Sequence, residues 1–145
     1  MPILRAATEQ DAAGIAALLA QLGYPSDEEA VAIRLANLER AGGYGCFVAD
    51  LDGRIVGMVA TSLGWYIEKD GAYVRIVALV VDEPLRQRGL GSALLDLAEQ
   101  WAAERGAGVM MLNAGAQRQE AQDFYRHRGY ASTGQRFVKT IASRS

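Results

Sequence analysis

The stretch of this chain richest in chemical information is residues 79–95, LVVDEPLRQRGLGSALL. Gly89 and Gly91 lie in a predicted strand-to-helix turn, where the first backbone amides of the helix lack internal acceptors. Glycine has no Cβ, so it adopts positive φ readily and lets a phosphate approach the backbone. Arg86 and Arg88 add two positive charges. The combination predicts a cradle for an anion such as a diphosphate; the alternative is a tight turn whose arginines only aid solubility.

Other nucleotide-binding signatures do not fit. A P-loop requires GxxxxGK followed by Ser or Thr, and the sequence has no such string. GLGSAL meets the dinucleotide fingerprint poorly, because Leu94 stands where a small residue should allow close helix packing.

Residue counts exclude several other chemistries. Cys46 is the only cysteine and His127 the only histidine, so an intrachain disulfide, a thiolate metal cage and a two-histidine site are not expected. We therefore predict no metal. The net charge of −2 argues against nonspecific nucleic-acid binding.

Composition favours a folded, water-soluble chain. Of its 145 residues, 50% are hydrophobic and 22% are charged, as in ordinary globular proteins. No apolar run approaches the roughly 18 residues that span a bilayer, and the start resembles no signal peptide. The expectation is a cytoplasmic protein without membrane contact.

Apolar spacing predicts two helices early in the chain. Thr8 and Asp11 fit a capping box, and Gly23 should end the first helix. Its apolar face is formed by Ile15, Leu18, Leu19 and Leu22. A second helix is expected to begin at Ser26, with Glu29 completing a capping box, and to end at Gly42 and Gly43.

From Cys46 onward, short β-favouring runs predominate. CFVAD and RIVGMVATS flank the turn residues Asp52 and Gly53, which predicts an antiparallel hairpin. AYVRIVALVV, residues 72–81, should form the longest strand. Further elements are expected in this order: a helix from residue 90 that closes at Gly106, a strand at 109–113, a helix at 120–128 and a final strand at 136–141.

The order strand, helix, strand, helix after residue 72 implies two neighbouring parallel strands joined to an antiparallel front half. The expected fold class is α/β, with a mixed, mostly antiparallel twisted sheet flanked by helices. No linker or repeat interrupts the sequence, so we expect a single domain over residues 1–145.

RQRGLG resembles the RxxGxG diphosphate loop of the Gcn5-related N-acetyltransferase (GNAT) family, which binds acetyl coenzyme A. That family places the loop between a long strand and an amphipathic helix and carries FYxxxG on a later helix, where this chain has FYRHRG. Two motifs in order are more specific than either alone. The similarity spans essentially the whole chain. The tail NAGAQRQEAQDFYRHRGY, followed by GQRFVK, resembles small-molecule amine acetyltransferases such as those acting on aminoglycosides and aminoalkylphosphonates.

The resemblance implies a coenzyme site. Main-chain groups of Leu79, Val80 and Val81 would pair with the pantetheine arm as an added strand does. Asn113 and Phe124 match positions that contact the same arm, with strand capping and core packing as their alternatives. The diphosphate would be held along the loop formed by Arg86, Gln87, Arg88, Gly89, Leu90, Gly91 and Ser92.

Tyr125 is the predicted catalytic residue. An amine that attacks a thioester expels a thiolate, and a phenol of pKa about 10 can protonate that sulfur as a general acid. The alternative is that its hydroxyl only anchors the helix. Many relatives carry an acidic general base on the long strand, where this chain has Val77 and Ala78. A water chain, Glu68 or Asp70, or an amine that arrives neutral would have to serve instead.

Tyr24, Trp65 and Tyr66 lie where relatives line the acceptor pocket, and aromatic faces attract cationic amines. They also fit ordinary core or rim positions. Arg118 matches a recurrent arginine of the tail, without an assignable task.

The function expected is direct transfer of acetyl from acetyl coenzyme A, as cosubstrate, to a primary amine of a small molecule. Cys46 is not expected to act as a nucleophile, because no histidine lies near it in the sequence. Two alternatives stay open: a catalytically silent acyl coenzyme A sensor, and a protein or peptide N-acetyltransferase. The sequence does not fix the oligomeric state; homodimers are common in the family that the chain resembles, and symmetric pairing is the usual outcome for soluble oligomers.

Overall fold

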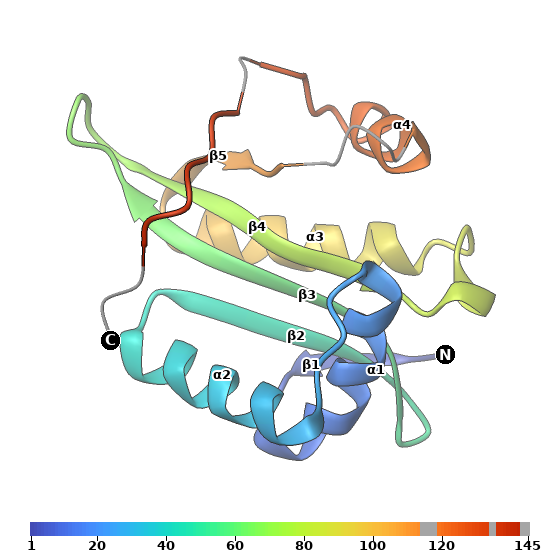
Figure 1. Cartoon of the computed structure of the whole chain (residues 1–145). Coiled ribbons are helices and arrows are strands. Elements are labelled where there is room, and N and C mark those ends of the chain that lie inside the picture. The colour runs from blue at the N-terminus through green and yellow to red at the C-terminus, as the bar shows by residue number, and fades with distance from the viewer. Residues whose placement is uncertain (114–118, 134–135, 143–145) are drawn as a thin grey trace. The chain divides into compact units, whose positions relative to one another are not determined.

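The structure, a computed structural model, describes residues 1–113, 119–133 and 136–142. Contacts within the chain divide it into two compact units, residues 1–112 and 113–145, and each is described by itself. Figure 1 labels their helices and strands. Among the described residues, no helix combines the length and the apolar character that a membrane crossing requires.

The first unit contains a five-stranded sheet in the order β1-β2-β3-β4-β5 (Figure 1). The neighbours from β1 to β4 pair antiparallel, whereas β4 and β5 pair in parallel. The predicted mixed α/β architecture is therefore confirmed. The strands are β1 (Ile3–Ala6), β2 (Tyr44–Leu51), β3 (Arg54–Trp65), β4 (Ala72–Val81) and β5 (Ala107–Met111).

The helices of the first unit begin and end near the predicted residues. They are α1 (Ala12–Leu22), α2 (Glu28–Ala41) and α3 (Leu90–Glu104), with the short 3-10 turns η1 (Glu9–Asp11) and η2 (Glu83–Leu85). The capping box of Thr8 and Asp11 is confirmed, as is the left-handed Gly23 that ends α1. The predicted start of α2 at Ser26 is wrong: the Asp27 carboxylate accepts the Ala30 amide at 2.7 Å and caps the helix, which begins at Glu28.

Side chains of the central strand β3 alternate between two helical layers, as the pleat of a strand requires. Met58 and Ala60 pack in the buried cluster that α1 and α2 form with the sheet. Gly57 faces the other layer, because a Cβ there would meet Leu94 of α3. Burial on both faces therefore fixes the register of β3 and of the neighbouring strands that position the candidate site.

The boundaries of three strands differ from those predicted. β1 was not predicted; it is a four-residue edge strand whose sequence, ILRA, carries little alternation, and pairing with β2 establishes it. β3, with 12 residues, exceeds β4, with 10, so AYVRIVALVV is not the longest strand. β5 covers residues 107–111, two residues earlier than expected, because its register is set by pairing with Ala72–Arg75 of β4.

Two irregularities interrupt the sheet. The β2–β3 register shifts between Ala49 and Asp50, and the β3–β4 register shifts between Ala60 and Thr61. The second shift leaves Val77 without a cross-strand partner, which makes it the extra residue of a β-bulge. Pairing of β4 with β5 ends at Arg75 and Met111. Within residues 1–112, the rest of β4 therefore has an open edge on its β5 side.

The second unit contains α4 (Gln119–His127), one residue ahead of the predicted range. Gly129 has φ 92, and its amide donates to Arg126, as expected of a C-terminal stop. His127 lies exposed at the helix end. The predicted strand at 136–141 is wrong: these residues are irregular, and Phe137 is 88% exposed. The β-favouring residues of this run permit a strand, but a partner edge is needed to form one. Arg118 lies outside the described residues.

Candidate functional site

The turn between β4 and α3 exposes the start of a helix. Gly89 is the N-cap of α3 with φ 85, and Gln87 also has positive φ, at 63. The Gly89 carbonyl accepts the Ala93 amide at 3.0 Å, which is the first intrahelical bond. No side chain among the described residues caps this helix. The amides of Leu90, Gly91 and Ser92 therefore lack an acceptor within the first turn.

The space beside this turn is open. A Cβ built on Gly89 would meet no atom within 4 Å. A helix N-terminus carries a partial positive charge, worth roughly 0.3–1 kcal/mol toward one anion. Free amides, open space and positive potential together suit a bound anion.

The two arginines of the turn have different surroundings. Arg86 folds back, so that its Nε donates to the Val81 carbonyl at 2.9 Å. Arg88 is exposed and makes no hydrogen bond or ion pair with the described part of the chain. Of the two arginines in this turn, Arg88 is therefore the one whose guanidinium is not engaged by the described residues.

The register of β4 decides which of its main-chain groups face the open edge. The Asp82 amide donates to the Val56 carbonyl at 2.8 Å, directly opposite it in the ladder. Hydrogen-bonded and non-hydrogen-bonded residue pairs alternate along an antiparallel ladder. The main-chain amide and carbonyl of Val80 therefore also face β3, whereas those of Leu79 and Val81 face the opposite edge of β4. Of the three residues predicted to pair with an extended ligand, only Leu79 and Val81 direct main-chain groups toward the open edge, where the Val81 carbonyl already accepts Arg86 Nε.

Three side chains that sequence reasoning did not single out support this turn. Asp82 is buried and receives a hydrogen bond from Gln21 of α1 and an ion pair from Arg54 of β3. Gln21 and Asp82 are 61 positions apart, so no local pattern could have linked them.

A model of the acetyltransferase (GNAT) family matches residues 12–130. The chain belongs to that family. The expected membership in that family is confirmed, and the open turn described above lies between β4 and α3 of this GNAT chain.

Curated relatives match part of this GNAT chain. It is 32% identical over 90 residues to an aminoalkylphosphonate N-acetyltransferase of Salmonella typhimurium, covering 62% of this chain and 58% of the relative. It is 35% identical over 88 residues to an uncharacterized N-acetyltransferase of Methanocaldococcus jannaschii, covering 59% and 38%. The matched region thus spans less than two thirds of these relatives.

Solved structures resemble the chain over nearly its full length. A GNAT family acetyltransferase of Staphylococcus aureus has a TM-score of 0.83 at 25% identity, covering 97% of this chain and 98% of the other. The fold is therefore that of GNAT acetyltransferases.

The predicted catalytic tyrosine lies in the second unit, on α4. The Tyr125 ring makes edge contacts with Phe124 and Tyr130, with centroids 5.2 and 5.6 Å away. The Tyr125 carbonyl accepts the Tyr130 amide at 2.9 Å. Burial raises the pKa of Tyr125 to about 12, so the phenol is protonated at neutral pH. Phe124 is half-buried, and Asn113 is exposed at the start of this unit.

The predicted acceptor aromatics do not gather at one place. Tyr24 follows α1, whose Gln21 contacts Asp82 just beyond β4, and is 66% exposed. Trp65, 68% exposed, pairs with Ala72 at the other end of β4. At about 3.3 Å per residue, that strand is about 30 Å long. Figure 1 shows the β3–β4 turn at the far tip of the sheet.

Tyr66 already interacts with its own neighbours at this tip. Its ring lies 5.0 Å from that of Tyr73, and Lys69 Nζ lies 4.4 Å from its centroid. One face of the Tyr66 ring is therefore shared with a cation of the chain. Glu68 and Asp70 are exposed in the same turn, about 17 Å or more along β4 from the Val77 bulge.

A cavity of about 450 Å³ lies elsewhere in the first unit. None of the predicted site residues lines it. Cys46 does, and burial raises the pKa of its thiol to about 11, which keeps the sulfur protonated. That protonation supports the expectation that Cys46 is not a nucleophile. The walls come from the β1–η1 segment, α2, the start of β2 and α3: Ala6, Ala7, Thr8, Glu9, Leu35, Leu38, Glu39, Tyr44, Gly45, Cys46, Phe47 and Trp101.

Proposed function

We propose that this chain, acting as one domain over residues 1–145, transfers an acetyl group from acetyl coenzyme A directly to a primary amine of a small molecule. Family membership supports the reaction class. The single observation that carries the proposal is the uncapped N-terminus of α3, where Gly89 leaves open space beside free amides.

Coenzyme A has two parts that suit the two open features of the first unit. Its diphosphate would accept hydrogen bonds from the amides of Leu90, Gly91 and Ser92, with Arg88 supplying a charge. Its pantetheine arm contains amides, which would pair with Leu79 and Val81 as an added strand does. Asn113 and Phe124 are proposed to contact the same arm.

In the reaction, the amine nitrogen attacks the thioester carbonyl, so that a C–N bond forms and the C–S bond breaks. The amine loses a proton, and the leaving sulfur gains one. We assign Tyr125 as the donor of that second proton, a general acid that burial keeps protonated. β4 contains no carboxylate, and Glu68 and Asp70 lie in the distant turn, so we assign the first proton to water. An amine that arrives as ammonium gives water a proton before the attack, and an amine that arrives neutral gives water its proton as the C–N bond forms.

The acceptor class rests on the relative from Salmonella typhimurium, whose name is that of an enzyme acting on aminoalkylphosphonates. A small amine is also consistent with Tyr24, an exposed aromatic residue in the loop that follows α1. Trp65 and Tyr66, at the β3–β4 turn, would contact only an acceptor that is long enough to extend along β4.

The proposal is tested by incubating the protein with acetyl coenzyme A and a panel of amines, aminoalkylphosphonates and amine-bearing peptides included, while free thiol is followed. Thiol release that depends on a small amine supports it. Calorimetry with coenzyme A gives the dissociation constant. Gly89→Asp places a carboxylate in the diphosphate position and should weaken binding at least about tenfold. Gly106→Asp, also at positive φ in open space, is the matched control.

A second candidate function, a silent acyl coenzyme A sensor, is favoured by one observation. Val77, the bulge residue, is 57% exposed where many relatives carry a carboxylate. Tight coenzyme binding without thiol release from any amine would favour the sensor. Modified peptides with unmodified small amines would favour a protein or peptide acetyltransferase.

A further inference from the structure

Gln21, in the last turn of α1, bonds through both ends of its side-chain amide to the segment that leads into the α3 turn. Its Nε2 donates to Asp82 Oδ1 at 2.8 Å. Its Oε1 accepts the Glu83 backbone amide at 3.0 Å and lies 3.5 Å from Arg86 Nη2. One surface side chain thus contacts the residue that follows β4, the first residue of η2 and the first arginine of the turn.

Asp82 anchors the same segment from the other side. It is 8% exposed and ion-paired with Arg54, at the start of β3. Its carbonyl accepts the Leu85 amide at 2.8 Å, which closes η2. The Gln21 hydrogen bond, followed by Arg54, holds the pKa of the Asp82 carboxyl below its usual range, so Asp82 is a carboxylate near neutral pH.

The turn that follows needs such support. Gln87 has φ 63, a left-handed backbone conformation that is costly for a residue with a Cβ. Conformations of this kind persist where the surrounding structure holds them. Arg86, directly before Gln87, is fixed through its own Nε to the Val81 carbonyl and through Gln21.

We propose that Gln21 is a positioning residue for the diphosphate turn, and that it acts by holding Asp82, Glu83 and Arg86 so that the α3 amides are aligned before the ligand arrives. This inference rests on the proposed function and deepens it, because it places a determinant of coenzyme affinity on α1. A preorganised turn loses less freedom on binding and therefore binds more tightly.

The test compares Gln21→Leu with Gln100→Leu, the same change at an exposed glutamine of α3. Calorimetry is run with coenzyme A and with pantetheine, which lacks the diphosphate. Gln21→Leu should weaken coenzyme A binding about three- to tenfold and change pantetheine binding less than about twofold, as the loss of one or two hydrogen bonds predicts. A merely structural role would weaken both ligands equally or lower only the melting temperature.

A second readout needs no coenzyme. Trypsin cleaves after arginine, and Arg86 and Arg88 are exposed. Without ligand, Gln21→Leu should speed cleavage after these two residues, whereas Gln100→Leu should match the wild-type protein. If the wild-type protein binds no coenzyme A, the proposed function fails, and trypsin still decides whether Gln21 holds the turn.

A variant pair that exchanges the amide of Gln21 and the carboxylate of Asp82 gives the third comparison. Gln21→Glu sets a carboxylate against Asp82 and should weaken coenzyme A binding further than Gln21→Leu. Adding Asp82→Asn places an amide donor opposite the new carboxylate at position 21. The double variant should recover part of the affinity for coenzyme A that Gln21→Glu loses. Equal coenzyme A affinity and equal cleavage in Gln21→Leu and Gln100→Leu would overturn the proposal.

Discussion

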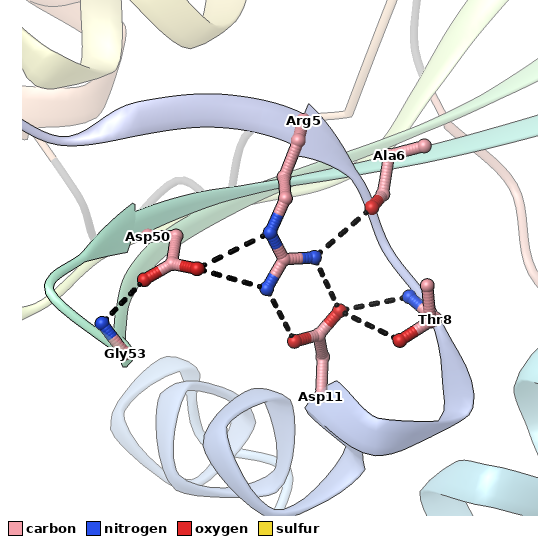
Figure 2. A network of polar contacts seen from close by, with 6 residues as sticks. All are labelled: Arg5, Ala6, Thr8, Asp11, Asp50 and Gly53. Carbon is pink, nitrogen blue, oxygen red and sulfur yellow. Dashed lines mark hydrogen bonds and ion pairs between the residues drawn. The ribbon is translucent and has the colours of Figure 1, made fainter.

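Arg5 and Asp11 form a two-pronged ion pair, in which Nη1 donates to Oδ2 and Nη2 donates to Oδ1, each at 2.8 Å (Figure 2). The same guanidinium donates to Asp50 of β2 through Nε at 3.2 Å and Nη2 at 3.1 Å. Asp11 also accepts the Thr8 amide at 2.8 Å. This network joins β1, η1 and β2, and so fixes where α1 begins.

Asp11→Asn should therefore destabilise the protein. An Asn side chain is uncharged and has a single oxygen, so it cannot reproduce the two charge-assisted hydrogen bonds that Asp11 accepts from Arg5. Losing them should cost about 1–2 kcal/mol of folding stability, after allowance for the partly exposed arginine. A fall in melting temperature of about 2–6 °C is expected. Thermal unfolding followed by circular dichroism measures it, with Asp70→Asn, at an exposed turn residue, as the control.

The effect of Asp11→Asn should also depend on pH. Hydrogen bonds from Arg5 hold the pKa of the Asp11 carboxyl below its usual range. A lowered folded-state pKa contributes stability that is complete above the unfolded value of about 3.9 and is lost as pH falls through the folded value. The difference in free energy of unfolding between wild type and variant, measured with urea, should stay constant between about pH 5 and 7 and should narrow below about pH 4. A gap that widens on acidification contradicts this account.

Gly45→Ala should be strongly destabilising because β2 passes against α3 there. A Cβ would lie 2.8 Å from Thr61 Oγ1 and 2.9 Å from Trp101 Cε2, in buried surroundings. Overpacking of this kind costs about 1–3 kcal/mol. Denaturant unfolding measures the loss. Gly108→Ala, in β5 with no atom near its Cβ, is the matched control and should be neutral or slightly stabilising.

Tyr125→Phe should lower turnover by about 10²- to 10⁴-fold while leaving the coenzyme A dissociation constant unchanged, because only the proton donor is lost. The pKa of Tyr125, raised to about 12 by burial, keeps the acid form present throughout the usual assay range. The wild-type kcat/KM should therefore rise with pH as the amine deprotonates and should not decline between about pH 8 and 10. Tyr44→Phe is the control, and a decline near pH 9 would remove Tyr125 from this role.

Tyr24→Ala and Trp65→Ala should have different effects on a small amine. Tyr24 stands near the end of β4 that leads to the α3 turn, whereas Trp65 pairs with Ala72 at the opposite end. Loss of one exposed cation–π contact should raise the amine KM about two- to fivefold in Tyr24→Ala. Trp65→Ala should leave that KM unchanged. Initial rates at saturating acetyl coenzyme A measure both, and equal effects would mean that the acceptor spans the strand.

Most of the secondary structure could be predicted because its signals are local. The turn at Asp52 and Gly53, the run AYVRIVALVV and the glycines before α3 each specify backbone conformation through residues a few positions apart. The strand β1 could not be predicted, because four residues at an edge become a strand only through a neighbour. The run RFVKTI, residues 136–141, contains β-favouring residues, but the described backbone there is irregular.

The sequence by itself determined the family of this protein, the α/β order of its elements and the turn at Gly89 that suits a diphosphate. Only the tertiary structure decided that Val77 forms a bulge, that Leu79 and Val81 rather than Val80 face the open edge, and that Trp65 lies far from the α3 turn. It also brought Gln21 to Asp82. Propensity and periodicity act over a few residues, whereas strand register and side-chain contacts depend on packing between segments that are distant in the chain.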